Sequence, residues 1–293
     1  MEFARIQGGF AMSSIRIVTD SACDLEGALT EQWGIRVVPL IITFDDEPLV
    51  DREELTPQDF YARMAASEEL PTTAAPSPGH FEEVFRSLAA DGATGIVCVN
   101  LSYELSATGP AAGTAAQAVA DVVEVRCVDS RSLTTGLGSI VIEAAKAAED
   151  GASLDEVEAL CCDLAERTRM FGAIDTMENL RKGGRVGGAV ALLGSMLSIK
   201  PIVDVSSGRV EEAARTRTRK KSFLWLRDRV LADEPVSHLC VGHGAAADVD
   251  DFLALLGESV DLARVRTGWI GPVIGTHAGQ GVLGVTYVVA SDS

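Results

Sequence analysis

Short apolar runs alternate with alanine-rich amphipathic stretches through the first half of the chain. The runs are rich in valine and isoleucine, which favour strands, and turn-forming residues lie between them. Because parallel strands are joined by crossover connections, usually helices, this alternation predicts a parallel sheet covered by helices. The predicted strands are residues 16–21, 35–44, 95–101 and 123–130.

Helices are predicted in the stretches between and after these strands. The helices between the strands begin close to a Thr, Ser or Pro, residue types that suit the first turn of a helix. Together with the strands they predict one α/β lobe. The predicted helices are residues 56–66, 78–90, 107–120, 138–149 and 153–169.

The pattern changes after about Arg169, where strand-like pieces meet a long apolar segment. A Ser-Ser-Gly turn at 206–208 predicts a hairpin, while residues 248–256 indicate a helix and residues 281–290 a terminal strand. This mixture predicts a second, α+β lobe with a mixed sheet. We therefore expect an N-terminal extension at residues 1–14, an α/β domain at 15–169 and an α+β domain at 170–293.

The charge balance restricts the partners that the protein can attract without a specific site. Its 293 residues include 25 Lys and Arg against 43 Asp and Glu, which gives a net charge of −18 at pH 7. Such a charge opposes non-specific attraction to nucleic acid or to anionic lipid surfaces. We therefore expect no nucleic-acid partner, and any anionic ligand must be held by local groups.

Hydropathy and cysteine usage bear on the compartment. No run reaches the roughly 18 apolar residues that a membrane span needs, so no span is expected. The six cysteines show no C-x-x-C spacing, and Cys98 and Cys127 lie in strand-like runs, as reduced and buried thiols do. We expect a cytoplasmic protein.

Three of the four predicted strands run directly into short hydroxyl-rich turns. These are TDS at 19–21, LSYELSATG at 101–109 and VDSRS at 128–132. In open α/β sheets, ligands bind at the carboxyl ends of the strands, so the three turns predict one shared binding rim. The alternative is that each Ser or Thr caps the helix that follows it.

Catalysis by a serine nucleophile is one interpretation of these hydroxyls, with Ser106 as nucleophile and His277 as base. The nucleophile elbow G-x-S-x-G is absent, because residues 104–108 read ELSAT and lack both glycines that relieve the sharp turn. A serine hydrolase or esterase therefore remains the alternative hypothesis.

Phosphate-binding and metal-binding motifs are also absent from the sequence. There is no G-x-x-x-x-G-K-[ST], and the glycines of LRKGGRVGG follow a helical stretch instead of a strand. The four histidines, at 80, 238, 243 and 277, show no shared ligand spacing. We expect no metal and no cofactor.

Neutral hydroxyls can instead bind an anion. Ser106 or Thr73, with the free N–H groups at the start of the helix near Ala107, can hold a carboxylate without a full positive charge. The segment 187–199 is almost wholly apolar, and 5% aromatic residues are too few for base-stacking platforms, which favours a long aliphatic ligand. The alternative is that this segment is an ordinary buried helix.

Seven blocks of the sequence have a distinctive order and spacing. They are TDSACDL (19–25), PTTAAPSPG (71–79), LSYELSATG (101–109), VDSRSLTTGLG (128–138), LRKGGRVGG (180–188), SIKPIV (198–203) and HAGQGVLG (277–284). These blocks resemble the DegV family, whose best-understood members are the fatty-acid-binding subunits of bacterial fatty acid kinase. The resemblance implies two lobes that enclose one long-chain fatty acid, with its carboxylate at the hydroxyl-rich rim. It also implies a carrier that presents the acid to a separate kinase, which makes the acyl phosphate; the carrier itself is not an enzyme.

The resemblance assigns the two hydroxyls that hold the carboxylate. The family's T-S-Q-P-S block falls on residues 73–77, so Thr73 takes the carboxylate-binding role, although Ala74 and Ala75 replace the usual Ser and Gln. The S-G-T block falls on residues 106–108, so Ser106 takes the second role, and Ala107 replaces the glycine.

The resemblance also assigns the remaining site residues. The H-x-G-x-G block places His277 near the carboxylate, with Gly279 in the same loop, and the G-G-R block places Arg185 at the mouth of the site. The basic cluster at 215–221 is expected to dock the kinase subunit, with Arg217 as the contact. A solvated helix start, or a regulatory nucleic-acid contact, is the alternative for that cluster.

Overall fold

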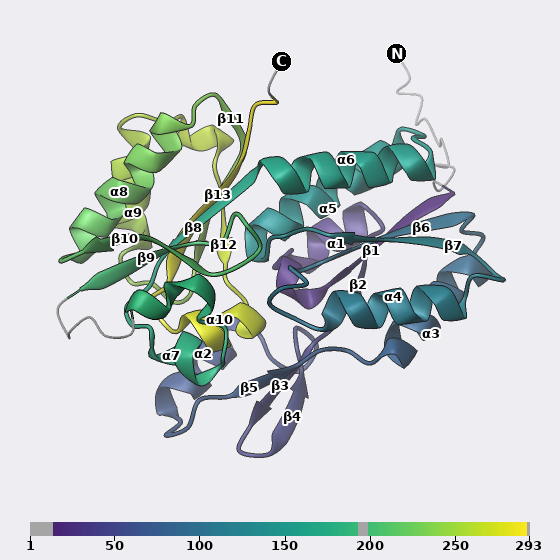
Figure 1. The fold of residues 1–293 in the computed structure, drawn as a ribbon, viewed down its shortest axis with the longest axis horizontal. Coiled ribbons are helices and arrows are strands. Elements are labelled where there is room, and N and C mark those ends of the chain that lie inside the picture. Colours follow the sequence, from purple (N-terminus) through teal and green to yellow (C-terminus); the bar gives the residue numbers. More distant parts are fainter. Residues whose placement is uncertain (1–13, 193–198, 292–293) are drawn as a thin grey trace, which may run out of the picture.

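The computed structural model describes residues 14–192 and 199–291, so the expected N-terminal extension lies almost wholly outside the described residues. It has two lobes side by side (Figure 1). The N-terminal lobe holds a four-stranded sheet in the order β2-β1-β6-β7, and every pairing in it is parallel, as predicted. Its strands are β1 (Ile15–Asp20), β2 (Arg36–Val38), β6 (Gly95–Asn100) and β7 (Glu124–Asp129).

Helices cover both faces of this parallel sheet (Figure 1). Residues of β6 alternate between the two faces: Ile96 and Cys98 pack with Phe81 and Phe85, whereas Val97 belongs to the core on the other side. A side chain cap begins two of the helices, because Ser77 accepts from the His80 N–H and Ser153 forms a capping box with Glu156. The helices are α3 (Pro78–Ala90) and α4 (Thr108–Ala118) on one face, and α5 (Thr134–Glu149) and α6 (Leu154–Arg167) on the other, with η1 (Ser21–Cys23) and α1 (Gly27–Gln32) after β1.

The prediction of a single strand at 35–44 is wrong. The chain leaves the parallel sheet after β2 and enters a separate three-stranded antiparallel sheet in the order β4-β3-β5. Pro39 lies at the break, and a proline has no N–H to donate to a continuing ladder. The new strands are β3 (Ile41–Phe44), β4 (Glu47–Val50) and β5 (Thr72–Ala74), with α2 (Pro57–Ala66) between the last two.

Helix α5 begins at Thr134, four residues before the predicted start at 138. Two glycines, which are weak helix formers, hid its first turn from the sequence pattern. Both are required by close packing: a Cβ at Gly136 would lie 2.2 Å from Ser132 Oγ, and one at Gly138 would lie 2.7 Å from the Cys23 carbonyl oxygen.

The C-terminal lobe holds the predicted mixed sheet, in the order β10-β9-β8-β13-β11-β12. The pair β11–β12 is parallel and the others are antiparallel, and the Ser-Ser-Gly turn at 206–208 joins the hairpin of β9 and β10. The strands are β8 (Thr168–Ala173), β9 (Lys200–Asp204), β10 (Glu211–Thr216), β11 (Val236–His243), β12 (Arg266–Trp269) and β13 (Leu283–Val289).

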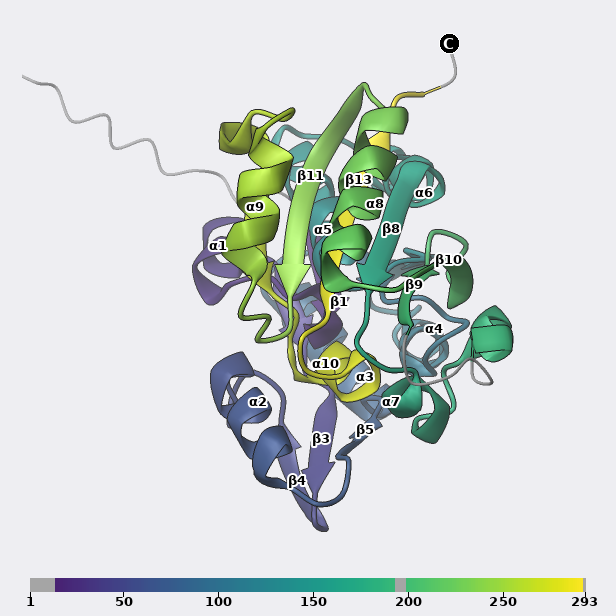
Figure 2. The same cartoon turned by 90° about the vertical axis from the view of Figure 1, so that its left-hand side faces the viewer.

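Helices α8 (Arg219–Ala232) and α9 (Val249–Gly257) cover the outer face of this sheet, in front of β11, β13 and β8 in Figure 2. Helix α5 contacts strands of both large sheets, so the two lobes share a core at their boundary. Short elements complete the fold. α7 (Glu178–Lys182), η2 (Gly187–Leu192) and α10 (Pro272–Ala278) lie below the C-terminal sheet in Figure 1, whereas η3 (Leu262–Arg264) packs against α9 and precedes β12.

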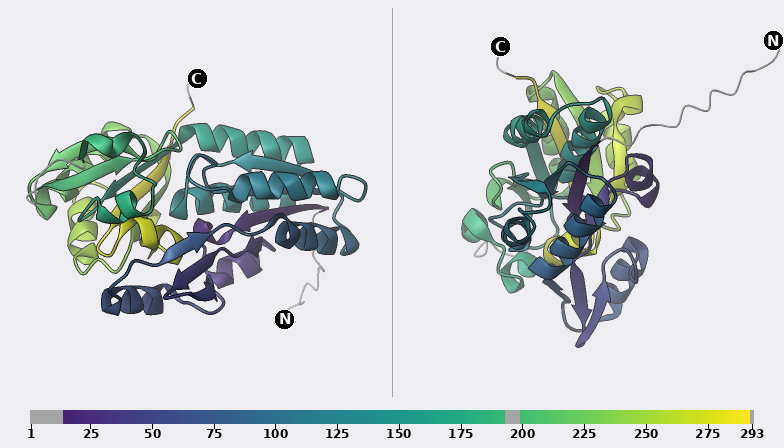
Figure 3. Two further views of the ribbon diagram at one scale, coloured as in Figure 1. Left: turned by 60° about the horizontal axis from the view of Figure 1, so that its bottom comes forward. Right: turned by 90° about the vertical axis from the view of Figure 1, so that its right-hand side faces the viewer.

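The small β3–β5 sheet projects from the N-terminal lobe toward α10, as the two views of Figure 3 show together with Figure 2. Contacts of α10 with α2, α7 and β5 fix this arrangement. Within the described ranges, no helix is long and apolar enough to cross a membrane. The domain boundaries expected from the sequence remain a prediction.

Candidate functional site

The rim at the ends of β1 and β6 is built around a buried carboxyl group. Asp20, the last residue of β1, accepts from Asn100 Nδ2 at 3.0 Å and from the Leu101 N–H at 2.9 Å. Burial raises the pKa of Asp20 to about 6, against the lowering effect of these bonds. The network fixes the start of the turn 101–109. The hydroxyl pattern of the sequence indicated this rim but not the role of Asp20, which lies in the TDS turn.

A cavity lies between the lobes, below α5. Its wall is mostly aliphatic and draws on both lobes, with Leu101 and Leu133 from the first and Met170, Val203 and Val282 from the second. Four of the five predicted ligand-binding residues also line it: Thr73, Ser106, Arg185 and His277. The structure therefore gathers predicted ligand-binding residues that lie up to 204 positions apart around one apolar space.

Thr73 and His277 meet across the cavity wall. Thr73 Oγ1, on β5, and His277 Nε2, near the end of α10, share a hydrogen bond of 3.0 Å. Burial, and then the charge of Arg185, lower the pKa of His277 to about 4, so its imidazole is neutral at pH 7. Its Nδ1 is buried and has no hydrogen-bond partner among the described residues. A Cβ at Gly183 would lie 2.3 Å from that nitrogen, which explains the glycine there.

Ser106 stands at the start of α4 and pairs with a neighbouring hydroxyl. Its Oγ lies 2.8 Å from Thr108 Oγ1 and accepts from the Thr108 N–H at 3.3 Å. Arg185 joins the same turn from the other lobe, because its Nε donates to the Leu105 carbonyl at 3.3 Å and its Nη1 to the Gly183 carbonyl at 2.7 Å. Ser106 and Arg185 are thus held close together at the polar part of the cavity.

Gly279 does not line this cavity among the described residues. It is the C-cap of α10, and its φ of +83° is in the region that favours glycine. Asn179 supports the same turn by donating from Nδ2 to the Thr276 carbonyl at 3.1 Å. The geometry gives Gly279 the role of turning the chain after His277, and its predicted part in ligand binding stays a prediction.

The apolar segment 187–199 begins as the short helix η2, and residues 193–198 lie outside the described residues. Its predicted role beside the ligand therefore stays a prediction. The described part of the aliphatic wall comes from residues scattered along strands, helices and the loops between them, which no local sequence signal distinguished from ordinary core residues.

The geometry needed for a serine hydrolase is not formed by Ser106 and His277. His277 Nε2 bonds to Thr73, and Ser106 bonds to Thr108. A base with a pKa of about 4 is mostly deprotonated at pH 7 but too weak to take a proton from a serine readily. No carboxylate of the described part of the chain orients the other ring nitrogen, which is unpartnered.

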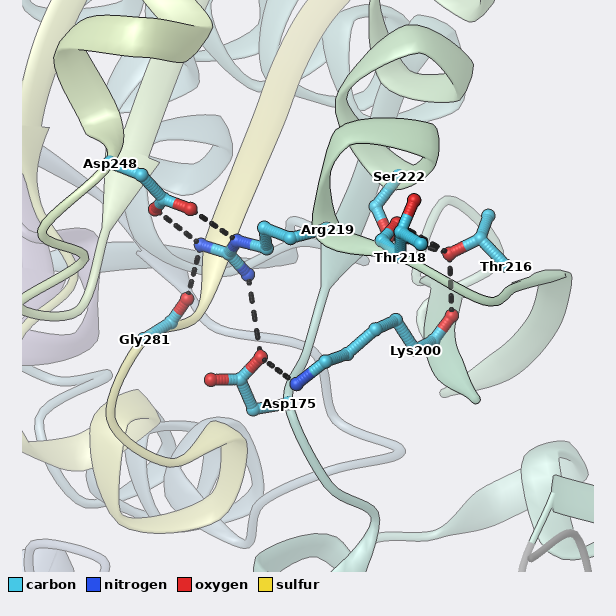
Figure 4. Close-up of polar contacts among 8 residues, drawn as sticks. All are labelled: Asp175, Lys200, Thr216, Thr218, Arg219, Ser222, Asp248 and Gly281. Carbon is cyan, nitrogen blue, oxygen red and sulfur yellow. Dashed lines mark hydrogen bonds and ion pairs between the residues drawn. The ribbon is translucent and has the colours of Figure 1, made fainter. Parts of the chain in front are cut away.

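The basic cluster at 215–221 runs from the end of β10 to the start of α8 (Figure 4), and none of its residues lines the cavity. Thr216 Oγ1 donates to the Lys200 carbonyl at 3.1 Å and lies 2.7 Å from Ser222 Oγ, while Thr218 caps α8. These bonds fix both neighbours of Arg217, whose side chain is exposed.

Arg219, two residues further on, has a different environment. It binds Asp248 through Nε and Nη2 at 3.0 and 3.1 Å, and Nη2 also donates to the Gly281 carbonyl at 2.6 Å (Figure 4). The Asp175 carboxylate, which pairs with Lys200 at 2.8 Å, is 3.9 Å from Nη1 of Arg219. Arg219 thereby ties the basic cluster to the loop that follows His277, and part of the cluster's charge is neutralised.

A metal site is not found in the parts of the chain that the structure describes, since no three His, Cys, Asp or Glu side chains there gather suitably. All six cysteines are free thiols.

The two lobes, the shared core and an apolar cavity with a polar part define a two-lobed α/β protein with an internal ligand site. The family model described as "Uncharacterised protein, DegV family" matches residues 14–290. The chain therefore belongs to the DegV family, as the sequence blocks had predicted.

Individual relatives agree with this assignment over almost the whole chain. A DegV domain-containing protein of Streptomyces coelicolor is 37% identical over 277 residues, which cover 92% of this chain and 97% of the relative. A second, from Listeria monocytogenes, is 34% identical over 282 residues, covering 94% and 99%.

Solved structures show the same fold. A DegV family protein from Thermus thermophilus, described for its fatty acid binding, superimposes with a TM-score of 0.86 at 32% identity, covering 94% of this chain and 99% of that one. DegV of Bacillus subtilis, described as a fatty acid binding protein, gives a TM-score of 0.83 at 27% identity, covering 96% and 100%.

Proposed function

We propose that this protein binds one long-chain fatty acid, with the acyl chain in the apolar cavity and the carboxylate at Thr73, Ser106 and His277. The observation that carries the proposal is a mainly aliphatic cavity between the lobes that is also lined by Thr73, Ser106 and His277. The Thermus and Bacillus relatives, both described as fatty acid binding, support the same ligand class.

The polar part of the cavity suits a carboxylate. In this structure Thr73 Oγ1 and His277 Nε2 bond to each other, and a carboxylate between them can accept a hydrogen from each. Hydrogen bonds to a charged group contribute about 1.5 to 3 kcal/mol each, so two or three donors offset much of the cost of burying the charge. Arg185, on the same wall, adds a favourable positive charge.

The acyl chain supplies most of the affinity. At about 0.8 kcal/mol per buried CH₂, a chain of about sixteen carbons gains about 10 kcal/mol before the costs of association. The head group therefore sets the orientation of the ligand, and the aliphatic wall sets the strength of binding.

The bound acid is presented to a separate kinase that converts its carboxylate to an acyl phosphate, so this chain acts as a carrier in the cytoplasm and is not itself the enzyme. Support comes from Arg217, which is exposed between two residues whose backbones are fixed. A fixed cation on an acidic protein is a suitable contact for an acidic surface of the kinase.

The test is ligand identification. Mass spectrometry of the protein purified from a bacterial host under non-denaturing conditions should show a long-chain fatty acid at close to one per chain. A ligand-free protein that also fails to take up palmitate or oleate would contradict the proposal.

A further inference from the structure

A second hollow adjoins the cavity on the side of α7. It lies between the segment Glu68–Thr73 on one side and residues of α7 and the following turn on the other, with Thr276 and His277 of α10 between them. We call it the antechamber. Thr73, Arg185 and His277 line both the antechamber and the apolar cavity, so a group held by these side chains borders both spaces.

The two spaces differ in chemistry. The wall of the cavity is mainly aliphatic, whereas the antechamber is lined by polar and charged residues, among them Lys182 and Arg185 on the α7 side and Glu68 and Glu69 on the other. Gly183 lies between the two cations, and any larger residue there would meet the imidazole of His277. The antechamber therefore reaches the imidazole itself.

The positive side of the antechamber can accept an anion. Arg185 donates to the carbonyls of Leu105 and Gly183 and has no carboxylate partner among the described residues. Lys182 forms one ion pair, with Glu178 at 2.8 Å, in which both side chains are about half exposed. A pair of cations beside a hydroxyl is a common environment for a phosphate, which carries more charge than a carboxylate and accepts more hydrogen bonds. The protein's net charge of −18 makes such a local concentration of cations necessary.

We propose that the antechamber is the phosphate subsite for a long-chain acyl phosphate, with Lys182 and Arg185 as the residues that bind the phosphate. This inference rests on the proposed function. A carboxylate oxygen of the bound acid attacks the terminal phosphorus of a nucleoside triphosphate that the kinase supplies. The new O–P bond forms as the bond to the β-phosphate oxygen breaks, and the nucleoside diphosphate leaves with that electron pair. The acyl chain stays in the cavity, and the transferred phosphoryl group lies in the antechamber.

Stable analogues test the subsite without the kinase. Hexadecylphosphonate and palmitate have the same number of carbon atoms and differ in the head group, so a change in the ratio of phosphonate affinity to palmitate affinity between variants reports the phosphate subsite. We expect Lys182→Ala to lower the affinity for the phosphonate relative to palmitate by about threefold or more, and the effect to shrink at high salt because the residue is partly exposed.

The matched control is Lys146→Ala, because Lys146 is also a half-exposed lysine in a helix and pairs with a glutamate, Glu143, at 2.8 Å. The control should leave the ratio of phosphonate affinity to palmitate affinity unchanged. Glu69→Gln should raise this ratio, because it removes a negative charge from the antechamber.

Two results would overturn the inference while the proposed function stands. The first is that the protein binds palmitate but not the phosphonate. The second is that Lys182→Ala and Lys146→Ala have the same ratio of phosphonate affinity to palmitate affinity, in which case the antechamber is a passage for solvent or ligand. A protein that binds neither compound would overturn both proposals.

Discussion

The two ends of α10 use their polar groups in different ways. At the start, the Gly271 N–H donates to Asp24 Oδ2 at 2.9 Å, and Tyr61 donates its hydroxyl to the Ile270 carbonyl at 2.9 Å. Asp24 is in turn paired with Arg52 at 3.0 Å. At the other end, His277 has one bond, to Thr73, and an unpartnered ring nitrogen.

Both ends join the C-terminal lobe to the N-terminal lobe and both border the cavity. The start does so through the apolar residues Val273 and Ile274, whereas the end places the imidazole of His277 at the cavity wall. At the start, the carboxylate of Asp24 and the hydroxyl of Tyr61 are buried and hydrogen-bonded, as groups that stabilise a fold are, and Nε of Arg52 is the buried atom there without a partner among the described residues. The bond at the end joins two groups that both reach the cavity and can exchange it for bonds to a ligand. We infer that the start of α10 contributes mainly to folding and its end mainly to binding.

The largest expected effect is on the start of α10. Asp24→Asn removes the charge that compensates Arg52, whose side chain is 23% exposed, while that of Asp24 is 1% exposed. Breaking a buried ion pair by neutralising one partner costs about 3 to 5 kcal/mol, so the free energy of unfolding should fall by about that amount. Denaturant unfolding measures it.

Asp228→Asn is the matched control, because Asp228 pairs with Arg227 at 2.7 Å but is 62% exposed. The control should change the free energy of unfolding by less than about 1 kcal/mol. Equal losses in the two variants would contradict a structural role for the start of α10.

The two ends of α10 should also differ in how pH changes the free energy of unfolding, and this is the second largest expected effect. Asp51, next to Arg52, is buried, and burial raises its pKa to about 7. Between about pH 4 and 7 the folded state therefore binds a proton that the unfolded state does not, and stability falls as the pH rises. His277 acts in the opposite direction. Its pKa falls from 6.5 to about 4 on folding, so the unfolded state binds the extra proton in that window and stability falls as the pH falls.

Each group should contribute about 2 to 3 kcal/mol to the difference in unfolding free energy between about pH 5 and about pH 8. Unfolding at both pH values, in the parent protein and in Asp51→Asn and His277→Gln, measures the contributions. Relative to the parent, Asp51→Asn should lower the free energy of unfolding at about pH 5 compared with that at about pH 8. His277→Gln should raise the free energy of unfolding at about pH 5 compared with that at about pH 8. A shift of the same sign in both variants would show that these groups do not titrate as their burial indicates.

Local pattern was sufficient for most of the N-terminal lobe. The helix predicted at 78–90 has those bounds in α3, and the strand predicted at 95–101 differs from β6 by one residue, because apolar periodicity and a clear Ser-Pro start coincide there. The pattern failed where tertiary packing decides, as at Pro39, where the strand changes sheets, and at the start of α5, where two glycines fit against Ser132 and Cys23.

The candidate site was predictable only through the blocks of sequence that resemble a family. Thr73 and His277 are 204 positions apart, and Asp24 and Gly271 are 247 apart, so no local pattern can pair them. The blocks indicated the first pair. They gave no indication of the second, nor of the unpartnered nitrogen of His277, because hydrogen-bond satisfaction depends on the whole surrounding structure.

The smallest expected effect concerns the end of α10. Thr73→Val keeps the shape of the side chain and removes the hydroxyl that bonds to His277 Nε2. Because Thr73 is half-buried and solvent can reach its surroundings, we expect the free energy of unfolding to change by less than about 1 kcal/mol. One hydrogen bond to the carboxylate is lost, so palmitate affinity should fall by about three- to tenfold, as a titration with the fatty acid would measure.

Two control variants test whether the effect of Thr73→Val is specific to the cavity. Thr114→Val, on the exposed face of α4, removes a hydroxyl that donates to the Pro110 carbonyl and should leave both quantities nearly unchanged. Tyr61→Phe removes the hydroxyl of an α2 residue that bonds to the Ile270 carbonyl at the start of α10. Its effects on stability and affinity should be the reverse of those of Thr73→Val, because it leaves that carbonyl unpaired in the core and removes no group from the cavity wall. It should therefore lose about 1 to 2 kcal/mol of stability and keep its palmitate affinity. If Thr73→Val instead loses stability and keeps its affinity, the Thr73–His277 bond is a second structural tie, and the two ends of α10 do not differ in function.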